Sequence, residues 1–218
     1  MSDQGLTIDG VPIRRPEDLI PIYEARLRNH GPTPETVLYD RTPANHHRKM
    51  AVYAGVLWSM LADRPDLQIL DVGCGYGSLA EFVPPDNYLG IDLVPGLIRQ
   101  ARADHPDHRF RCGELGTLNV TADIAVMAGV TGCVPDPFEL VGHAWGICQT
   151  GLLVDFIAAN RIEPDRVNPD TRTYQQAEIL DRLDKLGADR LVWRSWDTFD
   201  MYYLRRAYLP LARRRGRA

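Results

Sequence analysis

The stretch LQILDVGCGYGSL, residues 67–79, is the feature that most limits the folds open to this chain. It begins as a short apolar run and then places glycines at 73, 75 and 77, with Asp71 two residues before the first. Glycine loses more conformational freedom on folding than any other residue, so this density indicates a tight turn or a close approach to a ligand. In open α/β sheets, ligands bind beyond the carboxyl ends of the strands. The stretch therefore predicts a ligand-binding loop after the first strand of such a sheet.

From residue 67 onward, short apolar runs alternate with helical stretches. We expect strands in the runs LQILDVG, NYLGIDL, HRFRCGE, ADIAVMAG, GLLVDFIA, DRLVWRSW and FDMYYLRR, and helices at 78–82, 95–103, 137–148 and 173–186. Strands that are apolar throughout and alternate with helices are typical of a parallel sheet covered on both faces. The last two runs are so close that only a hairpin can join them, which predicts one antiparallel strand near an edge.

The first sixty residues have a helical pattern instead. Two segments separated by Pro32 and Pro34 carry apolar residues at helical spacing, and the first segment stops at Gly31. The apolar stripes consist of Leu19, Tyr23 and Leu27 in the first segment and of Met50, Tyr53, Leu57 and Leu61 in the second. The chain is therefore expected to be α/β with additional helices before its first sheet strand.

Composition narrows the classes of partner. The formal net charge of −4 argues against a large nucleic-acid surface, and no apolar run approaches the roughly 20 residues of a membrane span. The first ten residues lack the pattern of a secretory signal, so a cytoplasmic location is expected. The four cysteines form no CxxC pair, which favours reduced, buried thiols over a zinc site. No metal is expected.

The residues of the loop distinguish between two classes of cofactor. A dinucleotide site of the form G-x-G-x-x-G would have glycine at position 78, where this chain has Ser78. Asp71 beside the loop would repel an anionic pyrophosphate and attract an ammonium or sulfonium group. S-adenosylmethionine carries both cations and no phosphate. The loop therefore favours S-adenosylmethionine over NAD.

Two later positions fit the same ligand. Asp92, twenty-one residues after Asp71, ends the second predicted strand, where an acid is the expected partner of both ribose hydroxyls. Asp92 fits either cofactor and does not discriminate by itself. After the third predicted strand, Gly113 and Glu114 stand where a backbone group or a carboxylate could receive the adenine amine.

Taken together, LDVGCGYGSL, YLGIDLVPGLIRQA, FRCGEL and MAGVTGC resemble the motifs of class I S-adenosylmethionine-dependent methyltransferases, over about residues 67–206. The resemblance implies a Rossmann-like, seven-stranded, mostly parallel sheet with helices on both faces and an N-terminal helical lid. It also implies S-adenosyl-L-methionine as cofactor. The residues expected to bind it are Asp71, Gly73, Cys74, Gly75, Tyr76, Asp92, Leu93, Gly113, Glu114, Leu115, Ala128, Gly129 and Val130, with Tyr39 and Arg41 at the methionine carboxylate.

The same resemblance predicts how the chain is divided and which acceptor it uses. Residues 1–62 are expected to form the lid or substrate-binding segment, 63–208 the cofactor-binding core, and 209–218 a basic tail. The segment AGVTGC lacks both the N/D-P-P-Y/F motif of nucleobase amine methyltransferases and the Pro-Cys nucleophile of cytosine-ring enzymes. Asp155 stands alone in its strand, so a magnesium-dependent catechol type is not expected. A small-molecule methyltransferase of bacterial tailoring or specialised metabolism remains.

Candidates for direct catalysis are few. His46 shares a helical stripe with Met50 and Tyr53 and is the predicted general base, with His47 and His143 as weaker alternatives. Asp155, apolar-flanked in its strand, is predicted either to orient the substrate or to be a buried structural acceptor. The long connection over 157–171 is expected to form part of the acceptor pocket.

Several functions stay open at this stage. The expected partner is a small-molecule methyl acceptor, without a membrane or nucleic acid, and the protein is expected to be a monomer or a homodimer. The alternatives are an RNA or protein methyltransferase, a non-catalytic cofactor-binding scaffold or regulator, and an NAD-dependent oxidoreductase. The last conflicts with Ser78 and Asp71.

Overall fold

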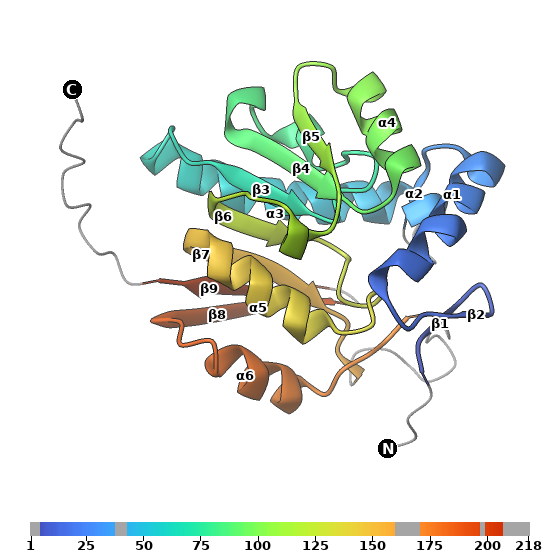
Figure 1. The fold of residues 1–218 in the computed structure, drawn as a ribbon. Coiled ribbons are helices and arrows are strands. Elements are labelled where there is room, and N and C mark those ends of the chain that lie inside the picture. The colour runs from blue at the N-terminus through green and yellow to red at the C-terminus, as the bar shows by residue number, and fades with distance from the viewer. Residues whose placement is uncertain (1–4, 38–42, 160–170, 197–198, 207–218) are drawn as a thin grey trace.

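The computed structural model of the chain describes residues 5–37, 43–159, 171–196 and 199–206. Within these residues, seven strands form one sheet in the order β5-β4-β3-β6-β7-β9-β8 (Figure 1). In chain order the strands are β3 (Ile69–Val72), β4 (Tyr88–Asp92), β5 (Arg109–Cys112), β6 (Ala122–Met127), β7 (Cys148–Phe156), β8 (Arg190–Trp196) and β9 (Phe199–Arg205). The predicted α/β class and Rossmann-like sheet are confirmed.

The direction of the strands also follows the prediction. The strands β3 to β7 pair in parallel, and β9 runs antiparallel to both of its neighbours, β7 and β8. β8 ends at Trp196 and β9 begins at Phe199, a separation that permits only a hairpin. The chain crosses from β5 back to β6 on the other side of β3. This reversal places the switch point, and with it the expected ligand crevice, beside the loop that follows β3.

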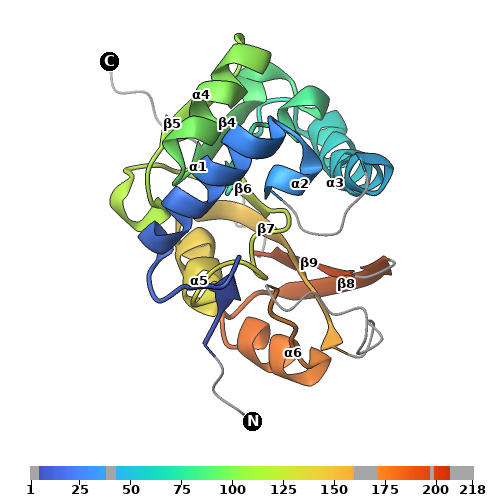
Figure 2. The same ribbon diagram turned by 90° about the vertical axis from the view of Figure 1, so that its right-hand side faces the viewer.

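Helices cover both faces of the sheet (Figures 1 and 2). On one face lie α3 (Pro43–Asp63) and α4 (Pro95–Asp104), and on the other lie α5 (Pro137–Ile147) and α6 (Gln176–Asp184). The predicted stripe of α3 is buried, since Met50, Tyr53, Leu57 and Leu61 are all 6% exposed or less. These side chains pack against the sheet, so α3 is part of the central layers.

Two predicted helices differ from the structure. The expected helix at 78–82 is reduced to a 3₁₀ turn, η2 (Ala80–Phe82), because Pro84 and Pro85 follow at once and cannot continue a helix. The expected helix from Thr173 begins only at Gln176. Tyr174 instead bridges to Ala158 as a short strand pair, which keeps the preceding backbone extended.

The N-terminal segment lies across the carboxyl ends of the strands (Figure 2). It consists of a hairpin of β1 (Thr7–Ile8) and β2 (Val11–Pro12), the 3₁₀ turn η1 (Pro16–Asp18), α1 (Leu19–His30) and α2 (Pro34–Val37). Glu24 of α1 accepts a hydrogen bond from the Gly96 amide at the start of α4, at 2.7 Å. This carboxylate acts as the helix cap that Val94 cannot supply. The division at residue 62 stays a prediction.

Candidate active site

A cavity of about 350 Å³ lies at the carboxyl ends of the central strands. The sheet side contributes the loops after β3, β4, β5 and β6, and the opposite side is formed by η1, α1 and α2. From the sheet, the lining includes Val72, Gly73, Gly75, Ile91, Asp92, Leu93, Gly113, Glu114, Leu115, Gly129, Val130 and Cys133. From the N-terminal segment it includes Arg14, Arg15, Pro16, Leu19, Tyr23 and Val37. Segments far apart in the sequence thus enclose one binding space.

The glycine loop needs its glycines for two physical reasons. Gly73, Gly75 and Gly77 all have positive φ angles, of 70°, 57° and 90°, which disfavour other residues. In addition, a Cβ on Gly73 would lie 2.5 Å from a methyl carbon of Val130, and one on Gly75 would lie 3.1 Å from Val37. The loop therefore packs directly against the loop after β6 on one side and against α2 on the other.

Asp92 links the glycine loop to the cavity. Its Oδ2 accepts a hydrogen bond from the Gly75 amide at 2.9 Å, and its Oδ1 accepts one from the Val94 amide at 2.8 Å. Burial raises the pKa of Asp92, while these backbone hydrogen bonds oppose the shift. Because Asp92 also lines the cavity, its carboxylate fixes the loop and faces the ligand space at once.

Asp71 lies deeper than the sequence suggests. It is 3% exposed and accepts a 2.7 Å hydrogen bond from the Tyr88 hydroxyl. Burial raises the pKa of Asp71 to about 7, a shift that Tyr88 opposes and that the charge of Asp92 reinforces. Burial and Asp71 raise the pKa of Tyr88 in turn, so the phenol remains a donor. Sequence reasoning missed Tyr88, whose only signal is a polar hydroxyl in an apolar strand.

The other predicted cofactor residues fall into three groups. Those that line the cavity are Gly73, Gly75, Asp92, Leu93, Gly113, Glu114, Leu115, Gly129 and Val130. Asp71, Cys74, Tyr76 and Ala128 lie beside these residues in the chain but are outside the lining, and Cys74 is buried in the core. Tyr39 and Arg41 lie outside the described residues, as does most of the long connection at 160–170. Binding by each of these residues stays a prediction.

The two predicted catalytic residues lie away from the cavity lining. His46 is 8% exposed on α3, with its ring centroid 6.4 Å from that of Tyr76. Asp155 is 2% exposed; its Oδ1 accepts a 2.8 Å hydrogen bond from the Gly129 amide, and its Oδ2 forms an ion pair with Lys49. Sequence reasoning missed Lys49. Its signal was position, since it lies one turn after His46 on the buried stripe of α3.

Two findings on membranes and metals hold for the described part of the chain. No helix there is long and apolar enough to cross a bilayer. No group of three or more histidine, cysteine or acidic side chains among the described residues could hold a metal ion.

Comparisons with known proteins agree with this geometry. Residues 70–154 match a family model described as a methyltransferase domain. The trans-aconitate 2-methyltransferase of Deinococcus radiodurans is 29% identical over 100 residues, which are 44% of this chain and 39% of that protein. The chain thus spans well under half the length of this curated relative.

Solved structures with the same fold cover nearly the whole chain. Magnesium protoporphyrin IX methyltransferase from Synechocystis PCC 6803, crystallised with bound S-adenosylhomocysteine, has a TM-score of 0.66 at 15% identity. That match covers 88% of this chain and 98% of the other. An S-adenosylmethionine-dependent methyltransferase from Clostridium acetobutylicum has a TM-score of 0.58 at 13% identity, covering 84% and 98%.

The sheet order and the glycine loop at its switch point define a nucleotide-cofactor domain of the Rossmann-like class. Residues 70–154 of it match the methyltransferase-domain model, and the fold is the one seen in solved S-adenosylmethionine-dependent methyltransferases. The predicted class is therefore confirmed.

Proposed function

We propose that this protein transfers the methyl group of S-adenosylmethionine to an oxygen, nitrogen or carbon nucleophile of a small metabolite. The observation that carries the proposal is the convergence of Gly73, Asp92, Glu114 and Val130 in one cavity, which α1 also lines. Three of them lie in the loops after β3, β5 and β6, and Asp92 is the last residue of β4. Each had been predicted from sequence to contact the same cofactor.

The cavity residues fit this cofactor chemically. Gly73 and Gly75 line the cavity with backbone and no side chain, which suits close backbone contact with the methionine portion. Asp92 would accept hydrogen bonds from the ribose diol, and Glu114 would lie at the adenine. Asp71, one layer below, adds negative charge near the cationic end. The same carboxylates would repel a pyrophosphate, which counts against NAD.

Bound S-adenosylmethionine supplies a methyl group already activated on a sulfonium. The tasks left to the chain are alignment of the acceptor and exclusion of water, and such positioning can supply roughly 7–11 kcal/mol of the barrier. α1 and α2 close the cavity over the glycine loop through Tyr23 and Val37. If the acceptor must lose a proton, His46 is the proposed base and His143, which lines the cavity, is the alternative. A general base is worth about 10²–10⁴-fold in rate.

The net charge of the protein and the enclosure of its cavity both favour a small acceptor. The net charge of −4 does not favour RNA, and the lid encloses the cavity on the side opposite the sheet. A cytoplasmic location, a place in bacterial tailoring or biosynthesis, and a monomeric or homodimeric state remain part of this proposal. A scaffold that binds the cofactor without transfer is the second candidate, because neither predicted catalytic residue lines the cavity.

Two experiments test the proposal in sequence. Calorimetry should show binding of S-adenosylmethionine and no tight binding of NAD; the reverse result would overturn the cofactor assignment. Methyl-labelled S-adenosylmethionine is then incubated with the protein and a bacterial metabolite extract, with RNA and protein pools as parallel arms. Trans-aconitate and magnesium protoporphyrin IX, the acceptors in the names of similar proteins, are tested as pure compounds. If the label appears only in RNA or only in protein, the acceptor is a macromolecule and the small-metabolite proposal is wrong. If no pool or compound is labelled, the non-catalytic scaffold is favoured.

A further inference from the structure

Lys49 and Asp155 form a buried ion pair directly behind the loop that follows β6. Both side chains are 3% exposed, and the pair joins α3 to the end of β7. The ammonium of Lys49 also lies 4.8 Å from the centre of the Phe199 ring, on β9. Three separate elements thus meet at one desolvated charge pair.

Asp155 reaches from this pair to the loop after β6 by two hydrogen bonds. Its Oδ1 accepts from the Gly129 amide at 2.8 Å, and its main-chain oxygen accepts from the Thr131 hydroxyl at 2.7 Å. Gly129 has a φ angle of 82°, so the direction of its amide depends on a backbone conformation that glycine permits. Asp155 therefore fixes the loop on both sides of Val130, through the carboxylate of the ion pair at Gly129 and through its main chain at Thr131.

Val130 is the point where this loop touches the cofactor site. It lines the cavity, and one of its methyl carbons fills the space in which a Cβ of Gly73 would stand. A shift of Val130 would change the width of the cavity at the glycine loop. Because the Asp155 carboxylate holds the Gly129 end of this loop, the charge balance around Asp155 is coupled to the shape of the cavity.

We propose that Lys49 and Asp155 are a positioning pair for the cofactor: Lys49 neutralises Asp155, and Asp155 holds Gly129 and Thr131 so that Val130 lies against Gly73. Neither residue touches the ligand space itself, and Asp155 on this account is not a proton acceptor. The inference rests on the proposed cofactor site and adds a residue, Lys49, to its support.

The charge balance gives the test its design. Removing one partner of a buried ion pair leaves an uncompensated charge, whereas removing both charges is far less harmful. In Lys49→Met, the carboxylate of Asp155 stays buried without its countercharge and is expected to draw in water or move, which displaces Gly129. In Lys49→Met/Asp155→Asn, the neutral amide oxygen still accepts from Gly129 while no charge remains. The double variant should therefore recover what the single variant loses.

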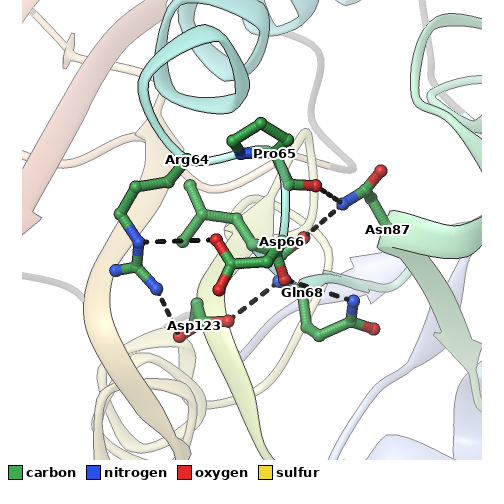
Figure 3. A network of polar contacts seen from close by, with 7 residues as sticks. Arg64, Pro65, Asp66, Gln68, Asn87 and Asp123 are labelled. Atoms are coloured by element: carbon green, nitrogen blue, oxygen red, sulfur yellow. Dashed lines mark hydrogen bonds and ion pairs between the residues drawn. The ribbon is translucent and has the colours of Figure 1, made fainter. Parts of the chain in front are cut away.

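The experiment measures S-adenosylmethionine affinity by calorimetry and the melting temperature for each variant. Lys49→Met is expected to bind about tenfold more weakly, and the double variant to return to within about threefold of the unaltered protein. Asn87→Ala is the matched control: Asn87 is a buried side chain at the opposite end of the sheet, donating 2.8 Å hydrogen bonds to the Pro65 and Leu67 carbonyls (Figure 3). It should lower the melting temperature without changing affinity.

Each outcome decides the proposal. If Lys49→Met keeps its affinity and loses stability as Asn87→Ala does, the pair has only a structural role and the proposal is overturned. The proposal is also overturned if the double variant binds S-adenosylmethionine no more tightly than Lys49→Met. Should Lys49→Met fail to fold, Thr131→Val removes only one hydroxyl and is still expected to weaken binding about threefold; unchanged affinity there would equally overturn the proposal. If the unaltered protein itself binds no S-adenosylmethionine, it is the proposed function that fails.

Discussion

The two ends of the parallel strands carry polar networks of opposite character. At the amino ends, Asp123 accepts a 2.9 Å hydrogen bond from the Gln68 amide and lies 3.6 Å from Arg64, with side-chain exposures of 21% and 23% for the charged pair (Figure 3). At the carboxyl ends, Lys49 and Asp155 are each 3% exposed. The first network remains in contact with water, and the second is enclosed.

The difference shows what each network does. The amino-end network satisfies backbone groups where β3, β4 and β6 begin, and no loop of the described cavity depends on it. The carboxyl-end network holds glycine-containing loops that line the cavity. Partly exposed ion pairs contribute about 0–1 kcal/mol, whereas loss of one partner of a buried pair costs about 3–5 kcal/mol. Substitutions at the two ends should therefore separate stability from cofactor binding.

Asp92→Ala should give the largest effect at the carboxyl end. It removes the acceptor for the Gly75 and Val94 amides and the proposed partner of the ribose. We expect affinity for S-adenosylmethionine to fall by about 100-fold or more, since bonds to a charged acceptor contribute about 1.5–3 kcal/mol each. Calorimetry checks this. Asp92→Asn keeps one acceptor oxygen, so its affinity should lie between those of the unaltered protein and Asp92→Ala. Equal affinity in the unaltered protein and both variants would show that Asp92 does not bind the cofactor.

Gly73→Ala should give the second-largest loss of affinity for S-adenosylmethionine. The new methyl group would lie 2.5 Å from Val130 at a φ angle of 70°, so both strain and displacement of the cavity wall are expected. Affinity should fall by roughly 30-fold. Gly187→Ala is the matched control, because Gly187 has a φ angle of 69° but nothing within 4 Å of the added carbon. It should lose similar backbone stability with no change in affinity, and parallel losses of affinity in both would contradict the account.

Asp123→Ala tests the amino end. It removes the acceptor of the Gln68 amide and the partner of Arg64, which should lower the free energy of unfolding by about 1–2 kcal/mol. Affinity for S-adenosylmethionine should stay the same. Urea unfolding and calorimetry on the same preparation measure the two quantities, and a matching drop in affinity would break the proposed separation of the two ends.

Among the carboxyl-end residues, Asp71 should give the smallest effect on affinity, one that depends on pH. Because burial raises its pKa to about 7, the folded protein retains a proton that the unfolded chain loses near pH 4. Stability should therefore fall as the pH rises from about 4 to about 7, and Asp71→Asn should flatten this slope. Ionisation of Asp71 adds a negative charge near the cationic end of the cofactor. Affinity for S-adenosylmethionine should therefore rise roughly fivefold between about pH 6 and pH 8. The dependence should vanish in the variant, and its persistence would exclude Asp71 as the cause.

Much of this arrangement could be predicted from local sequence. Glycines at 73, 75 and 77 and the alternating apolar runs predicted the loop and the sheet, and the acid at position 92 was predicted to face the ligand. The structure places Gly73, Gly75 and Asp92 at one cavity. The prediction of a helix after β3 was wrong, because Pro84 and Pro85 end the segment after one 3₁₀ turn. The hydrogen bond between Tyr88 and Asp71 and the pair of Lys49 with Asp155 were missed, since each joins residues on different elements.

By itself, the sequence determined which segments form strands and which turn requires glycine, because those choices depend on side-chain periodicity and on backbone angles within a few residues. Only the tertiary structure decided the state of its buried charges. The burial of Asp71, the countercharge of Asp155 and the contact of Val130 with Gly73 all arise from segments brought together by folding. Electrostatic free energies depend on distance and burial in space, and separation along the chain does not reveal either.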